Sequence, residues 1–367
     1  MSGRSPAAMR KKVLLMGRSG AGKTSMRSII FANLIARETS RLSATLDVEY
    51  STVRFMGDLV LNIWDCGGQE VFLESYFEAE RDSIFRDVAI LIYVFDIKSA
   101  EVEKEFINYE RCIKAISRDG QDARVFCLVH KMDVVPPERR KVVFHAKESE
   151  IISRSRGLDT RCYPTSIWDE TLYKAWSSIV YALVPNVEAL GLALSGLADA
   201  CDADEVVLFE KATFLVVSSR TRRSHRDKHR FEKMSNIVKQ LKLACMGSAS
   251  HLDSVQIANS RFRAILVPLT ATTIVMIVTP RPGPAAGLCL LNAAVARPEF
   301  DRILLHSAEG GGAAAAASAA APVAASEAGA PADGVGASAA ADAEDSFRQD
   351  AAGGGPPAPP PTPSKKK

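Results

Sequence analysis

Residues 17–24 read GRSGAGKT, and this glycine-rich octet restricts the possible folds more than any other feature of the chain. It matches the pattern G-x-x-x-x-G-K-[ST]. The apolar run KKVLLM precedes it and SMRSIIFANLIA follows, so the octet joins a predicted strand to a predicted helix. Backbone N–H groups in such a loop converge on phosphate oxygens at a helix N-terminus. We expect Lys23 to reach the β and γ phosphates and Thr24 to hold Mg²⁺.

The rest of the chain divides into three predicted regions. From residue 9 to 184, short β-rich runs alternate with amphipathic stretches, which predicts an α/β domain with a mostly parallel sheet. The stretch VRFMGDLVLNIWD within it reads as a hairpin. Residues 185–306 group strands around one or two helices, which predicts a separate α+β domain. Residues 307–367 are rich in Ala, Gly and Pro, and we expect this tail to be disordered.

Composition limits the setting. The 367 residues carry 46 basic and 43 acidic side chains, a net charge of +3 that gives no reason to expect a nucleic-acid partner. The seven cysteines form no metal-binding pattern, and such scattered thiols are typical of a cytoplasmic protein. No apolar run reaches transmembrane length and no lipidation pattern is recognisable. We therefore expect contact with a membrane to be indirect.

The sequence WDCGGQE supplies a second group of site residues. Asp65 closes an apolar run, where a carboxylate faces the metal through water. The N–H of Gly68 is predicted to meet the γ-phosphate. Gln69 follows directly, and we expect this residue to act with Lys23 in catalysis by orienting the attacking water. The alternative is that Asp65 caps a turn and Gln69 lies on the surface.

The segment RETSRLSATLDVEY lies between these two motifs. A triphosphate-dependent switch needs a threonine there that reaches Mg²⁺, and Thr45 is the choice because it leads into the next strand. Thr39 is the alternative, or a second contact with ribose or phosphate. Arg37 and Arg41 are candidates for a catalytic arginine in cis, although solvated arginines at a helix end explain them more simply.

The letters HKMD follow the buried run RVFCLV, and ligands of open α/β sheets bind at the carboxyl ends of strands. The carboxylate of Asp133 can accept hydrogen bonds from N1–H and the 2-amino group of guanine, which adenine lacks. Lys131 is predicted to lie along the base and touch the phosphate loop. A neutral His130 keeps one donor and one acceptor. Backbone groups of Ser166 and Ile167 are expected at the guanine O6 edge. The alternative is a core histidine after a strand.

Together these stretches resemble the Rag GTPases, most closely the RagA/RagB branch that includes yeast Gtr. The resemblance rests on the phosphate loop, WDCGGQE, the HKMD letters and TSIWDETLYKAWSSIVYALVPN. It spans roughly residues 9–305, and EVVLFEKATFLVVS resembles the C-terminal roadblock (longin-like) domain of that family. It implies GTP or GDP with Mg²⁺ as ligands. The nucleotide contacts that it implies are Ser19, Gly20, Gly22, Lys23, Thr24, Ser25, Thr39, Thr45, Gly68, His130, Asp133 and Ile167.

The resemblance also implies a biology. Rag proteins pair as heterodimers of a RagA/B-type and a RagC/D-type chain through their C-terminal domains. A Ragulator-like scaffold holds them on the cytosolic face of the lysosome or vacuole. The GTP-loaded subunit recruits the TOR kinase complex when amino acids are sufficient, and a GATOR-type activator accelerates hydrolysis.

Other readings remain open at this point. One is a scaffold that holds nucleotide without hydrolysing it, and another is a solitary trafficking GTPase of the Arf type. A P-loop kinase is disfavoured because HKMD would go unexplained. The basic stretch from Arg220 to Lys233 is either a solvated loop or a contact for anionic lipid or an acidic scaffold.

Overall fold

The computed structural model describes residues 9–56, 59–68, 84–118, 123–184, 186–223, 227, 230–231, 233–235, 237–239 and 254–305. The predicted tail, the turn of the predicted hairpin and Gln69 lie outside these residues. So does part of the basic stretch between Arg220 and Lys233. The hypotheses about them therefore stay predictions.

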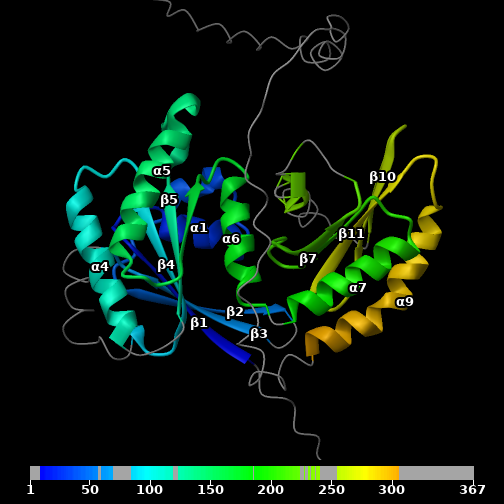
Figure 1. Cartoon of the computed structure of the whole chain (residues 1–367), viewed down its shortest axis with the longest axis horizontal. Coiled ribbons are helices and arrows are strands. Elements are labelled where there is room, and N and C mark those ends of the chain that lie inside the picture. The colour runs from blue at the N-terminus through cyan, green and yellow to red at the C-terminus, as the bar shows by residue number, and fades with distance from the viewer. Residues whose placement is uncertain are drawn as a thin grey trace, which may run out of the picture. The chain divides into compact units, whose positions relative to one another are not determined.

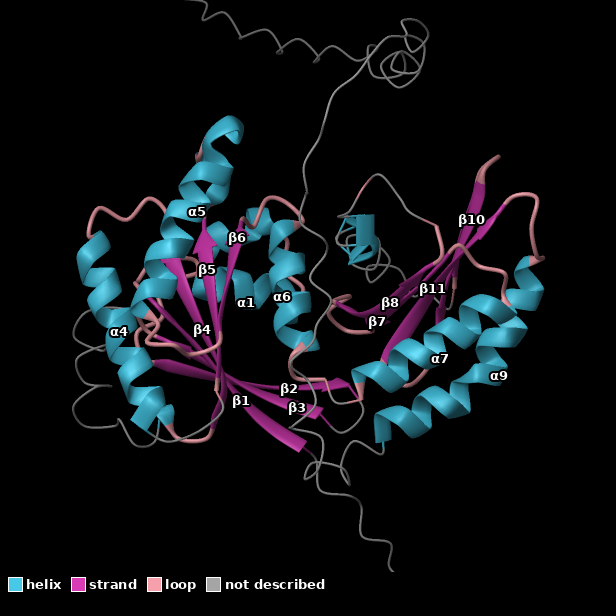
Figure 2. Ribbon diagram, viewed as in Figure 1, coloured by secondary structure: helices cyan, strands magenta, loops and turns pink. Residues whose placement is uncertain are grey.

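Among the described residues of the N-terminal region, six strands form one sheet in the order β2-β3-β1-β4-β5-β6 (Figures 1 and 2). β2 runs antiparallel to β3, and every other neighbouring pair is parallel. The expected mostly parallel sheet is confirmed. The strands are β1 (Met9–Gly17), β2 (Val48–Met56), β3 (Leu59–Cys66), β4 (Val88–Asp96), β5 (Arg124–His130) and β6 (Thr160–Thr165).

Helices cover both faces of this sheet (Figure 2). They are α1 (Lys23–Phe31), α4 (Val102–Arg118), α5 (Pro137–Arg154) and α6 (Thr171–Tyr181). Successive strand residues point to opposite faces. In β4, Ile92 belongs to the core under α1 and α6, whereas Leu91 and Tyr93 belong to the core under α4 and α5. A strand buried on both faces is continuously apolar, as VAILIYVF is.

The helix after the phosphate loop is shorter than expected. The amphipathic pattern predicts a helix to Ala36, but α1 ends at Phe31. Asn33 follows with φ of 58°, a left-handed conformation that a helix cannot continue through. The chain then forms the 3-10 helix η1 (Ala36–Arg41), with a second one, η2 (Met132–Val134), after β5.

The C-terminal region has its own sheet of five described strands, all antiparallel, in the order β8-β7-β11-β10-β9. The strands are β7 (Glu205–Glu210), β8 (Val216–Thr221), β9 (Val255–Ala258), β10 (Phe262–Pro268) and β11 (Thr273–Pro280). The helices α7 (Val187–Ala200) and α9 (Ala286–Leu305) lie on one face of it (Figure 2). Leu194 of α7 and Phe300 of α9 pack there with Leu208 of β7.

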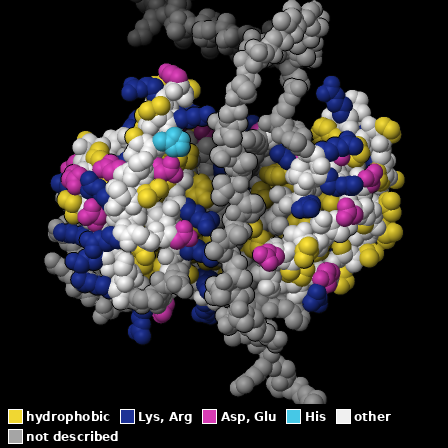
Figure 3. All heavy atoms as spheres, viewed as in Figure 1, with side chains coloured by type: hydrophobic (Ala, Val, Ile, Leu, Met, Phe, Trp, Pro, Cys, Tyr) yellow, Lys and Arg dark blue, Asp and Glu magenta, His cyan; other side chains and the backbone are white. Residues whose placement is uncertain are grey.

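Charges of both signs are interspersed over the molecular face in Figure 3, in keeping with the small net charge. No helix in the described part of the chain is long and apolar enough to cross a membrane.

Candidate functional site

The parallel strands of the N-terminal sheet bring their carboxyl ends to one edge. β1 leads there into the phosphate loop (Gly17–Thr24), and β3 ends just after Asp65. The last residues of β4, β5 and β6 are in register, with Asp96 beside His130 and His130 beside Thr165. Polar residues that are far apart in sequence thus line one edge, where ligands of such sheets bind.

A cavity of about 250 Å³ lies at the phosphate loop. Eight of its lining residues are among the predicted nucleotide contacts: Ser19, Gly20, Gly22, Lys23, Thr24, Ser25, Thr45 and Gly68. The remaining lining residues, Leu42, Ser43 and Ala44, lie just before Thr45 and carried no recognisable motif. The cavity therefore joins the phosphate loop, the segment before β2 and the end of WDCGG.

Two glycines allow the backbone to pack closely around this cavity. A Cβ on Gly17, whose φ is 137°, would lie 2.4 Å from the carbonyl oxygen of Val94. A Cβ on Gly68 would lie 2.2 Å from the backbone nitrogen of Ser19, and the Ser19 N–H donates to the Gly68 carbonyl at 2.8 Å. The loop after β3 thus touches the phosphate loop directly, at a distance that leaves no space for any side chain.

The buried side chain of Lys23 donates to two carbonyls of its own loop. Its Nζ lies 2.8 Å from the Gly17 oxygen and 3.0 Å from the Arg18 oxygen. Burial lowers the pKa of Lys23 to about 8, and the nearby Asp65 partly counteracts that shift. The ammonium remains largely protonated at neutral pH, so it can compensate phosphate charge.

The residues expected to bind Mg²⁺ come together in a manner that fits the ion. The hydroxyl oxygens of Thr24 and Thr45 are 2.7 Å apart, close to the separation of adjacent ligands around an octahedral ion with bonds of about 2.1 Å. Asp65 is fully buried, and its Oδ1 has no hydrogen-bond partner in the described part of the chain. A buried carboxylate oxygen without a partner is costly unless a ligand satisfies it.

The other residues of the predicted switch segment lie differently. Thr39 belongs to η1, and its hydroxyl donates to the Ala36 carbonyl at 2.8 Å. It does not line the cavity at the phosphate loop, in contrast to Thr45. Arg37 lines a separate cavity of about 430 Å³, and Arg41 is the last residue of η1.

His130 is a buried, neutral member of this edge. Its Nδ1 lies 3.0 Å from the Thr165 hydroxyl. A Cβ on Gly22 would lie 2.8 Å from the imidazole, so the ring packs directly against the phosphate loop. Burial lowers the pKa of His130 to about 4, and the charge of Lys131 adds to this effect. The side chain keeps one donor and one acceptor at neutral pH.

Lys131 connects three loops. It has φ of 64°, and its Nζ donates to the Gly20 carbonyl at 2.7 Å and pairs with Asp96 at 2.6 Å. The sequence predicts this contact between Lys131 and the phosphate loop. The sequence motifs do not include Asp96, although its position at the carboxyl end of the strand beside β5 is a usable signal. Thr165, the partner of His130, was also missed, because only strand register reveals it.

Asp133 is held by the loop after β6. Its Oδ1 accepts a hydrogen bond from the Ser166 hydroxyl at 2.8 Å. Ile167 lines the 430 Å³ cavity together with Leu34 and Ile35, which follow α1. Ile35 lines the same cavity as Ile167 of the loop after β6, and it belongs to no recognisable sequence motif. The predicted base contacts thus lie on two neighbouring loops joined by a hydrogen bond.

Comparison with known proteins gives the family. Residues 12–238 match the model of the Gtr1/RagA G protein conserved region. The chain is 55% identical to Ras-related GTP-binding protein A of Dictyostelium discoideum, over 81% of this chain and 98% of that protein. It is 50% identical to GTP-binding protein gtr1 of Schizosaccharomyces pombe, over 79% and 94%.

A more distant relative is Ras-related GTP-binding protein C of Mus musculus, which is 24% identical over 57% of this chain and 53% of its own length. The difference in identity places the sequence with the A/B type. The chain therefore belongs to the RagA/RagB branch of the Gtr1/RagA family and is a small GTPase that binds GTP and GDP with Mg²⁺.

Proposed function

We propose that this chain is a GTP-controlled switch that signals amino-acid sufficiency to the TOR kinase complex. The observation that carries the site assignment is the convergence of three loops. The phosphate loop, the Thr45 segment and Gly68 line one cavity, and Lys131 ties the adjoining HKMD loop (His130–Asp133) to Gly20.

In the proposed site, the backbone N–H groups of residues 19–25 and the ammonium of Lys23 bind the phosphates. Asp133 reads guanine through its carboxylate, with Ser166 and Ile167 at the O6 edge. Thr24 and Thr45 would hold Mg²⁺ through their hydroxyls, and Asp65 would hold it through water. When bound, the ion neutralises charge that develops on the β and γ phosphate oxygens. Gln69 orients the water for in-line attack, and Lys23 stabilises the charge of the transition state.

We further propose that residues 9–184 form the GTPase domain and residues 185–306 a roadblock (longin-like) domain that joins a RagC/D-type subunit. Five antiparallel strands with two helices on one face support this assignment. A Ragulator-like scaffold then holds the pair on the cytosolic face of the lysosome or vacuole. A GATOR-type activator accelerates hydrolysis that is slow without it.

Two experiments test this function. Lys23→Ala should abolish stable GTP loading, whereas Lys12→Ala, which removes a lysine that donates to the Arg86 carbonyl instead, should load normally. Normal GTP affinity in Lys23→Ala would refute the site.

Affinity purification of the tagged chain from its native cells should yield a second GTPase at a one-to-one ratio. A chain that purifies alone, folded and GTP-loaded, would favour a solitary switch.

A further inference from the structure

Arg27 lies on α1, one turn beyond Lys23, and no part of the site described so far uses it. Its Nε donates to Oδ2 of Asp65 at 3.0 Å, and its Nη2 pairs with Oε2 of Glu49. Only 16% of the Arg27 side chain is exposed, and Asp65 is fully buried. One guanidinium therefore bonds two carboxylates on two different strands.

Those two carboxylates lie directly opposite each other. Glu49 of β2 is the register partner of Asp65 on the antiparallel strand β3. Like charges at opposed positions of an antiparallel pair repel, and a buried carboxylate without a partner is costly. The planar guanidinium presents donors in two directions, which a lysine ammonium on its single stem cannot match. Arg27 thus compensates both charges at once.

The hydrogen bond to Arg27 also fixes which oxygen of Asp65 is available. Oδ2 is occupied by Arg27, whereas Oδ1 has no partner among the described residues. β2 begins three residues after Thr45, and the N–H of Gly67 donates to the Asp47 carbonyl at 3.0 Å. Arg27 therefore holds both the carboxylate itself and the strand into which the Thr45 segment leads.

We propose that Arg27 is a positioning residue for the Mg²⁺ site: by bonding Oδ2 of Asp65 it keeps Oδ1 directed at the water shell of the ion, and through Glu49 it fixes the start of β2 relative to α1. This inference rests on the proposed nucleotide site. Groups that orient a metal ligand typically change metal affinity about 10–100-fold when they are removed.

The test measures metal-dependent nucleotide retention, so it does not depend on hydrolysis. The full chain is loaded with fluorescent GDP, and GDP release is followed at increasing MgCl₂ concentration. Arg27→Met should raise the Mg²⁺ concentration for half-maximal retention by about 10–100-fold. Arg27→Lys keeps the positive charge but loses the planar guanidinium with its several N–H donors. The rise in the Mg²⁺ concentration for half-maximal retention should therefore be smaller than for Arg27→Met. Should Arg27→Met fail to fold, an Arg27→Lys variant identical to the wild type would overturn the proposal.

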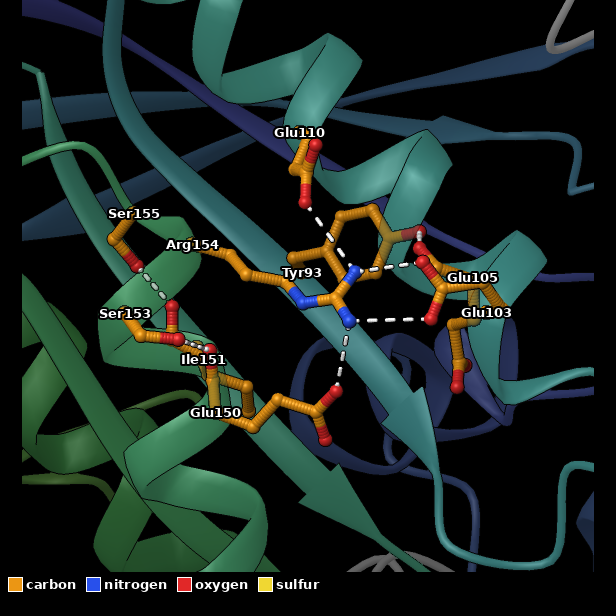
Figure 4. Close-up of polar contacts among 9 residues, drawn as sticks. All are labelled: Tyr93, Glu103, Glu105, Glu110, Glu150, Ile151, Ser153, Arg154 and Ser155. Atoms are coloured by element: carbon orange, nitrogen blue, oxygen red, sulfur yellow. Dashed lines mark hydrogen bonds and ion pairs between the residues drawn. The ribbon is translucent and has the colours of Figure 1, made fainter.

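Arg154 provides a matched control. This arginine of α5 bonds Glu103 and Glu110 of α4 and Glu150 of its own helix (Figure 4). Arg154→Met also removes a guanidinium that bridges several carboxylates. Arg154 is far from the phosphate loop in sequence, and its helix α5 packs on the face of the sheet opposite to α1. The substitution should lower thermal stability and leave the Mg²⁺ dependence within about twofold of wild type, because surface ion pairs act locally.

A double-mutant cycle separates positioning from general destabilisation. If Arg27 acts on the metal site through Asp65, the rise in required Mg²⁺ concentration caused by Arg27→Met should be smaller in an Asp65→Asn background than in wild type. The part that remains measures the contribution through Glu49. Additive shifts, or an Arg27→Met variant with the Mg²⁺ dependence of wild type, would overturn the proposal. If wild-type protein retains GDP equally well without Mg²⁺, the proposed Mg²⁺ site is refuted. That outcome differs from one that refutes only the role of Arg27.

Discussion

The phosphate loop and the HKMD loop lie at neighbouring strand ends, but they are held in place in different ways. Around the phosphate loop, backbone meets backbone: Gly17 and Gly68 approach other main chains so closely that a Cβ has no space. The HKMD loop is instead held by side chains, through His130 with Thr165 and Asp133 with Ser166. A glycine held by such backbone contacts tolerates no side chain. A loop held by side chains tolerates a substitution that keeps the same donors and acceptors.

This difference explains how a histidine can occupy the first position of HKMD. The ring keeps a polar atom for the Thr165 hydroxyl and fills the space against Gly22. In the proposed site the base is read by Asp133, whose carboxylate no side chain with a donor group can replace. The comparison therefore predicts a graded set of effects, with Asp133 first and His130 near the end.

The largest effect is expected from Asp133→Asn. The carboxylate accepts two hydrogen bonds from guanine in the proposed site, and an amide would present a donor to a donor. Two bonds to a charged group are worth about 1.5–3 kcal/mol each, so GDP affinity should fall about 10³-fold. Equilibrium titration with fluorescent GDP measures this, with the exposed Asp159→Asn as control. A loss below tenfold would mean that Asp133 does not read the base.

The second-largest effect is expected where the phosphate loop is held by backbone contacts. Gly68→Ala places a Cβ 2.2 Å from the Ser19 nitrogen, so one of the two loops must move. Overpacking of this kind costs about 1–3 kcal/mol, which corresponds to roughly a 10–100-fold loss of GTP affinity. Gly191→Ala is the matched control, because a Cβ there meets nothing within 4 Å. Unchanged GTP binding in Gly68→Ala would remove the distinction between the two loops.

A smaller effect is expected from His130→Asn. Asparagine keeps a donor and an acceptor, so GDP affinity should change less than about tenfold, while the lost ring packing lowers stability by about 1–2 kcal/mol. Thermal melting and GDP release rates measure the two quantities separately. The pKa of His130 is lowered to about 4. Titration of this side chain therefore cannot produce an inflection near neutral pH in a plot of GDP release rate against pH. A loss of GDP affinity beyond 100-fold would make His130 a principal base contact.

How far sequence could predict this site follows from the same comparison. The phosphate loop and WDCGG were readable because their residues are contiguous and their chemistry is tied to spacing. The partners that hold the HKMD loop, Asp96 and Thr165, were not, because they reach their contacts through strand register. Arg27 was missed as well, because only the packing of α1 against the sheet brings it to Asp65. The end of α1 was misjudged for a local reason: Asn33 adopts a left-handed conformation that the apolar pattern does not reveal.

The smallest effect concerns a buried carboxyl behind the HKMD loop. Oε1 of Glu105 accepts the Asp96 N–H at 3.0 Å, and the Asp96 carboxylate pairs with Lys131. Burial raises the pKa of Glu105 from 4.5 to about 7; the charge of Asp96 adds to this, while the Asp96 N–H bond, Lys147 and Arg18 oppose it. The folded chain therefore binds more protons than the unfolded chain between pH 4.5 and 7. Stability contributed by this group falls as pH rises through that window.

Glu105→Gln removes the titration but keeps an acceptor for the Asp96 N–H. The variant should gain melting temperature relative to wild type as pH rises from 5 to 8, because only the wild type must ionise a buried group. The exposed Glu103→Gln on the same helix should show no such trend beyond the loss of its pair with Arg154. Parallel pH profiles for Glu105→Gln and wild type would show that Glu105 does not titrate in this range. A melting-temperature difference that grows between pH 5 and 7 would assign this pH dependence to Glu105, since His130 in the HKMD loop stays largely neutral over that range.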